Sequence, residues 1–96
     1  MIDKVYDILE DMDEELEEAE EYARRAVECS KTHPAHKSMY LSMAEDELKH
    51  FEKLGEILMS HSANFGDEMK YFIAKKHSAM QKNHANVKMI ISKAHE

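Results

Sequence analysis

Hydrophobic residues recur every three or four positions along most of this 96-residue chain, which is the spacing of an amphipathic helix. Short polar breaks divide the pattern into three segments. We therefore predict helices over residues 3–29, 35–61 and 67–94. Pro34 suits the first turn of the second helix, where no backbone donor is lost. Because the first break is short, the first two helices should form an antiparallel hairpin.

The first predicted helix combines one apolar stripe with several acidic faces. Its stripe consists of Val5, Leu9, Met12, Leu16, Ala19, Ala23 and Ala26. Most acids of the run 14–21 fall on polar rows and should be solvated. Glu15 differs, because residues seven positions apart nearly align on a helix and its row (Ile8, Tyr22, Cys29) carries no other charge. If one acid of the run points inward, we expect Glu15, with Glu20 as second choice.

The second predicted helix places an acid and an imidazole within its apolar stripe. The three expected rows are Tyr40, Glu47 and Leu54; Met43, His50 and Ile57; and Ala44, Phe51 and Leu58. A buried carboxylate needs a compensating cation or metal ion. Glu followed three residues later by His is the pair that di-iron carboxylate bundles point into their core. The motif is common by chance in a chain rich in Glu and His, so its position in the stripe carries the argument.

The third predicted helix has its own stripe, formed by Met69, Ile73, Met80, Val87, Ile91 and Ala94. His77 and His84 lie at the edge of this stripe. Seven helical residues span about 10 Å, which is too far for both imidazoles to share one ion. We interpret them as packing or surface histidines.

Composition limits the function classes. Two Gly and one Pro among many helix-forming residues indicate one all-α domain. The net charge of −7 argues against nucleic acid or an anionic membrane as a partner, and it suits attraction of cations. The single cysteine excludes an internal disulfide and is consistent with a reducing cytoplasm. Neither a leader nor a run of membrane length is recognisable, so we expect a cytoplasmic protein.

The candidate ligands amount to half of a di-iron set. A complete carboxylate site takes one Glu from each of two helices and Glu-x-x-His from each of two others. One chain supplies Glu15 on its first helix, and Glu47 and His50 on its second. Two hairpins about a twofold axis would supply the whole set and would cover a face that one hairpin leaves open. We therefore expect a homodimer that forms a four-helix bundle.

The chain resembles the ferritin-like superfamily, and within it the small half-bundle ferritins packaged inside encapsulin shells. The resemblance rests on Glu14-Glu15-Leu16-Glu17, on Tyr22 seven residues after Glu15, and on Glu47-Leu48-Lys49-His50 after a short break. It covers roughly residues 10 to 60. It implies that Glu15, Glu47 and His50 bind iron across a subunit interface, with Tyr22 beside the metal but not bonded to it.

The resemblance also implies assembly beyond the dimer. Dimers of that family associate into rings, so a ring-like homo-oligomer is expected. Encapsulated members carry a short C-terminal targeting peptide, and residues 92–96 do not look like one. Two alternatives therefore remain: an encapsulin shell surrounds this protein, or the protein works outside a shell.

The leading hypothesis is a ferroxidase that oxidises Fe(II) to Fe(III) for iron storage or detoxification. Carboxylates with one imidazole per metal suit iron, and Mn or Zn could substitute. Glu47 would bridge two irons, Glu15 and His50 would be terminal ligands, and Glu14 and Glu18 would guide Fe(II) inward. A hemerythrin-like oxygen carrier is disfavoured because the chain lacks His-x-x-x-His and His-x-x-x-Glu. A metal-free helical protein-interaction module is the alternative.

Overall fold

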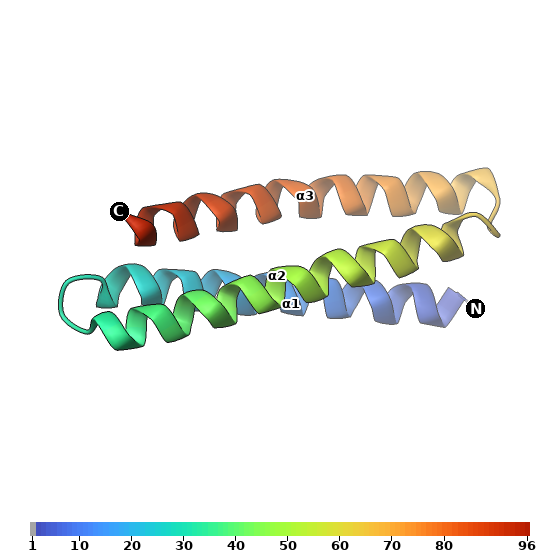
Figure 1. Ribbon diagram of the computed structural model, residues 1–96. Coiled ribbons are helices and arrows are strands. Elements are labelled where there is room, and N and C mark those ends of the chain that lie inside the picture. Colours follow the sequence, from blue (N-terminus) through green and yellow to red (C-terminus); the bar gives the residue numbers. More distant parts are fainter. Residues whose placement is uncertain (1) are drawn as a thin grey trace.

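The computed structural model contains three long helices joined by two short turns (Figure 1). It describes the backbone of residues 2–96 and the side chains of residues 4–96. The helices are α1 (Ile2–Cys29), α2 (Pro34–Ser62) and α3 (Asp67–His95). The predicted all-α class is confirmed, and each helix end lies within one residue of its predicted position. No helix among the described residues is long and apolar enough to cross a membrane.

Helix α1 buries the stripe that its sequence predicts. All seven stripe residues from Val5 to Ala26 lie in the core. The small side chains of Ala19, Ala23 and Ala26 allow the neighbouring helices to approach closely at the end near the first turn. Beyond them, the Ser30 hydroxyl lies 3.2 Å from the Ala26 carbonyl oxygen and 3.4 Å from that of Ala94. The end of α1 is thereby held against the end of α3.

Helix α2 is rotated relative to the prediction. Its buried residues are Leu41, Ala44, Leu48, Phe51, Gly55, Leu58 and Ser62. The row of Tyr40, Glu47 and Leu54 is only half-buried, and His50 and Ile57 are exposed. The expectation that His50 lies within the buried stripe is therefore wrong for the single chain. The reason is that α2 packs against both α1 and α3, and this rotates its most buried line towards Leu41 and Leu48.

Helix α3 lies along one side of the hairpin and runs in the same direction as α1 (Figure 1). Its predicted stripe is buried except for Met69, which is half-buried, and His84 is buried with it. Contacts to the hairpin include the edge-to-face pair of Phe72 and Tyr6, at 5.9 Å between ring centroids, and Asn86 near Glu20 at 3.5 Å. The assembly of three helices measures 52 × 18 × 14 Å.

The opposite side of the hairpin is not covered by α3. We call it the open face. It is formed by two rows of α2 and one row of α1, all half-buried or exposed: Ile8, Glu15, Tyr22 and Cys29; Tyr40, Glu47 and Leu54; Met43, His50 and Ile57. The candidate ligands of α1 and α2 thus lie on the one side of the hairpin that this chain leaves accessible. Packing of two chains into a four-helix bundle stays a prediction.

Candidate metal centre

Three predicted ligands come together at the middle of the open face. Each of Glu15, Glu47 and His50 offers one ligand atom, and these atoms lie within 4.8 Å of one another. His50 Nδ1 lies 3.4 Å from Glu15 Oε2 and 3.9 Å from Glu47 Oε1. The centre joins two helices, because Glu15 belongs to α1 and the other two residues belong to α2.

Local helix geometry explains why these side chains meet. Glu47 and His50 are three residues apart and so project from neighbouring positions on one face of α2. Glu15 lies near the middle of α1, which crosses the middle of α2 in the antiparallel hairpin (Figure 1). Ala19 follows Glu15 by four residues, Ala44 precedes Glu47 by three, and both alanines are fully buried. Their small side chains allow the two helix backbones to approach closely. The meeting therefore depends on the hairpin register.

The two carboxylates are incompletely satisfied. The Glu15 side chain is 23% exposed and that of Glu47 is 18% exposed, whereas the His50 side chain is 58% exposed. The Oε2 atoms of both acids are buried and have no hydrogen-bond partner. Buried carboxylate oxygens normally find a donor or a cation. Two carboxylates that each keep such an atom, beside one imidazole, therefore fit a site for a cation.

The pKa of Glu47 is affected by its acidic neighbour. A hydrogen bond with Glu15 raises the pKa of Glu47 above its ordinary value of 4.5, and burial adds to the shift. Glu18 and His50 act in the opposite direction on that pKa. A carboxyl group can donate to another carboxylate only when it holds a proton. The Oε2 atoms of Glu15 and Glu47 both lack a hydrogen-bond partner. A proton or a metal ion must therefore relieve the pair.

Glu18, which was predicted to guide Fe(II) inward, interacts directly with Glu47. Its hydrogen bond with Glu47 is the main cause that raises the pKa of Glu18, followed by burial. Its side chain is nevertheless exposed, as is that of Glu14. Glu18 is therefore an exposed acid beside the half-buried Glu47, and Glu14 is a surface residue. Glu20, the second choice for the inward-facing acid, points towards α3 and binds Arg24 and Asn86.

Tyr22 lies on the open face but outside the ligand cluster. Tyr22 follows Glu15 by seven residues, which corresponds to about 10 Å along the helix axis. Its ring stacks on Tyr40, with 6.3 Å between centroids, and the Arg25 guanidinium lies 5.8 Å from the Tyr40 centroid. The sequence had placed Tyr22 and Tyr40 in the two rows that contain Glu15 and Glu47. The stacking itself could not be predicted, because it depends on the register of the hairpin.

The donor set matches hard or borderline divalent cations. Two carboxylates and one imidazole suit Fe(II), and also Mn(II) and Zn(II), without choosing among them. Three protein ligands leave coordination positions available for water, a substrate or ligands from a second chain. This arrangement is half of the set that a di-metal carboxylate bundle contains.

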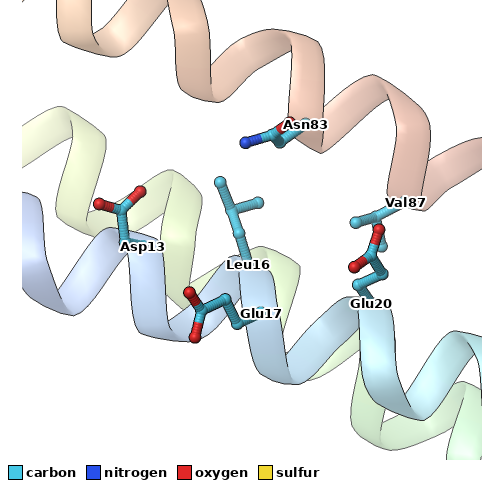
Figure 2. A pocket seen from close by; sticks show the side chains of 6 residues that line it. All are labelled: Asp13, Leu16, Glu17, Glu20, Asn83 and Val87. Carbon is cyan, nitrogen blue, oxygen red and sulfur yellow. The ribbon is translucent and has the colours of Figure 1, made fainter.

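A second acidic cluster, between α1 and α3, is organised differently (Figure 2). It surrounds a cavity of about 150 Å³ lined by Asp13, Leu16, Glu17, Glu20, Asn83 and Val87. The carboxylates of Asp13, Glu17 and Glu20 point in different directions rather than towards one point (Figure 2). The acids at this cavity therefore lack the convergence seen for Glu15, Glu47 and His50.

We expect the metal-free protein to show a pH dependence that originates at Glu47. Because the folded-state pKa of Glu47 is raised, its stabilising contribution is complete below about pH 4.5 and is lost as the pH rises through the raised value. The Glu47→Gln variant cannot titrate there and should lose this dependence. Urea unfolding of both proteins in chelator between pH 4.5 and 7 measures the difference in free energy of unfolding. If the difference in free energy of unfolding between the two proteins stays constant over this pH range, the raised pKa of Glu47 is contradicted.

Comparison with known proteins gives no relative: no family model matches the chain, and no curated protein or solved structure matches it significantly.

Proposed function

We propose that this protein is a di-iron ferroxidase whose site forms when two copies pack through their open faces. The observation that carries the proposal is the convergence of Glu15, Glu47 and His50, with two buried carboxylate oxygens that lack a partner. Iron is the substrate of the reaction. The ferritin-like resemblance of the same residues supports the choice of iron over other divalent metals.

The exposure pattern of the open face supports a second copy as its partner. Ile8, Tyr22, Tyr40 and Leu54 pack against the core but remain partly accessible, and Ile57 is 47% exposed. These side chains flank the ligand cluster at both ends. A second hairpin on this face would remove apolar surface from water while it brings three more ligands to the centre. In this arrangement metal binding and dimerisation support each other.

The proposed reaction oxidises two Fe(II) per turnover. Each iron loses one electron, and O₂ takes up two electrons and two protons to give hydrogen peroxide and two Fe(III). Glu47 would bridge the two irons, and Glu15 and His50 would each bind one. Glu18 holds or releases a proton beside Glu47, and the acidic surface of α1 attracts Fe(II) from solution.

The biological setting follows from the shape of the site. An open bundle has no cavity for a mineral, so iron storage would require a surrounding compartment, for which an encapsulin shell is the candidate. Ring-like association of dimers and a cytoplasmic location belong to the same proposal. Detoxification of Fe(II) needs neither shell nor ring.

Assembly provides a direct test. Because each site takes ligands from two chains, Fe(II) under anaerobic conditions should shift the protein from monomers to dimers or larger rings. Size-exclusion chromatography with light scattering, in Fe(II) and in chelator, measures the mass. The His50→Ala variant should respond much less. Wild-type protein that remains monomeric in excess Fe(II) would contradict the shared site and favour a metal-free interaction module.

A further inference from the structure

A third buried atom has the same unsatisfied character as those of the iron site. Among residues 4–96, the buried side-chain polar atoms without a hydrogen-bond partner are Glu15 Oε2, Glu47 Oε2 and His84 Nε2. His84 lies on α3 and is buried at the interface with α2, on the side of the hairpin away from the open face. It therefore does not belong to the proposed iron site.

The nearest charged atom to His84 is a carboxylate oxygen at a separation typical of two ligands on one ion. His84 Nε2 lies 3.3 Å from Glu52 Oε1, yet the two groups are not aligned as a hydrogen bond. Two ligands at about 2.1 Å from a tetrahedral ion are roughly 3.4 Å apart. We propose that His84 and Glu52 form a second cation site, for Zn(II) or a similar borderline divalent ion, between α2 and α3.

The His84 ring is oriented by packing, and its buried Nε2 has no hydrogen-bond partner. It stacks on Phe51, with 5.2 Å between centroids and 26° between ring planes. Phe51 also stacks on His77, at 6.5 Å and 9°. A metal-binding imidazole works best when surrounding groups fix its direction. Here an aromatic contact from α2 holds the ring.

Glu52 leaves the other side of the site open. Its side chain is 54% exposed, whereas that of His84 is 11% exposed. Glu52 and Phe51 also line an open groove of about 440 Å³, together with Gly55, Glu56, Met59, His77 and Gln81. A cation held by Glu52 would therefore be open to water on the Glu52 side. Among residues 4–96, no Lys or Arg nitrogen lies within 4.0 Å of the Glu52 carboxylate to compete with a metal.

A bound ion would tie α3 to the hairpin. Helix α3 contacts α2 less extensively than it contacts α1. A bond from Glu52 on α2 and one from His84 on α3 would strengthen this smaller interface. With two protein ligands, the site should bind more weakly than the cluster of Glu15, Glu47 and His50. Metal at this place would stabilise the docking of α3 and would take no part in iron oxidation.

Calorimetric titration with Zn(II) tests the site in a background that lacks the iron ligands. The background carries Glu47→Leu and His50→Ala, so failure of the ferroxidase proposal does not affect the result. Glu52→Gln in this background should lower the Zn(II) affinity of one site per chain at least tenfold, and His84→Phe should do the same. Binding at the other histidines is common to the background, Glu52→Gln and His84→Phe, and it cancels in that comparison.

His95→Phe is the matched control. His95 Nε2 also lies near a carboxylate, 3.8 Å from Glu45 Oε1. However, the His95 side chain is 59% exposed and that of Glu45 is 50% exposed. We expect the control to keep the full Zn(II) affinity. Hydrogen exchange provides a second measurement: Zn(II) should slow exchange of α3 amides around His84 in the background and not in its Glu52→Gln derivative.

Glu52→Gln decides the question even if His84→Phe does not fold, because Glu52 is exposed and glutamine keeps its shape. The proposal is overturned if the background binds no Zn(II), if Glu52→Gln leaves the titration unchanged, or if His95→Phe loses as much affinity as Glu52→Gln. In those cases His84 and Glu52 form only an ion pair.

Discussion

Aerobic oxidation of Fe(II) should fall at least tenfold, and by as much as about 100-fold, when His50 or Glu15 is replaced by alanine. Changes to groups that only orient a ligand typically cost 10- to 100-fold, and the loss of a ligand itself should cost no less. His50 Nδ1 lies 3.4 Å from Glu15 Oε2, so either substitution removes one member of the same cluster. The growth of Fe(III) absorbance in the near ultraviolet, corrected for oxidation in buffer, measures the rate.

Neighbouring acids supply the controls for this experiment. Glu14 precedes Glu15 in the same acidic run but is exposed, so Glu14→Ala should change the rate by less than twofold. The neighbouring Glu47 raises the pKa of Glu18, so the two carboxyl groups interact, which predicts an intermediate loss for Glu18→Ala, mainly at low Fe(II) concentration. If Glu14→Ala and Glu15→Ala slow oxidation equally, the acids act only through their charge and Glu15 is not a ligand.

The choice of Glu15 from an acidic run illustrates what the sequence can predict. Helical periodicity assigns each residue to a row, and only the row of Glu15 combined one acid with Ile8 and Tyr22. The structure brings Glu15 to Glu47 and His50 as that row required. The helix ends were equally predictable, since Pro34 and the polar turns interrupt the apolar pattern.

The rotation of α2 was beyond the reach of periodicity. Leu41 and Leu48 are as apolar as Leu54, so the sequence allows several lines of greatest burial around α2. Contact with both α1 and α3 selects the line through Leu41, Leu48 and Gly55. This selection leaves Glu47 half-buried and His50 exposed. A second chain packed on the open face would bury Glu47 and His50.

Contacts between α3 and the hairpin were the least predictable part of the fold. His84 was expected to pack or to face solvent, and it is buried against Phe51 with Glu52 close to its Nε2. These partners lie more than 30 positions away in the chain, and their meeting depends on how α3 settles on α1 and α2. A single sequence gives the apolar face of α3 but does not specify which side of the hairpin that face covers.

The metal-free protein should become more stable when Glu47 is replaced by leucine, by about 1–3 kcal/mol per dimer. The Glu47 side chain is 18% exposed, its Oε2 atom lacks a partner, and the neighbouring Glu15 carboxyl group and burial raise its pKa. Ionised Glu47 is therefore costly in the absence of a cation, and two copies in a dimer would also repel each other. Leucine would remove this cost and would extend the half-buried row between Tyr40 and Leu54.

The same substitution should abolish the stabilisation that wild-type protein gains from metal, because binding energy for the folded state requires the ligand. Melting curves for each protein in chelator and in saturating Fe(II) without oxygen, at one fixed protein concentration, measure both effects. Glu14→Leu is the matched control, since it makes the same change at an exposed position of α1 and should be near neutral in both conditions. A Glu47→Leu protein that melts below wild type in chelator, or that keeps the full shift in Fe(II), would show that Glu47 is not a buried metal ligand.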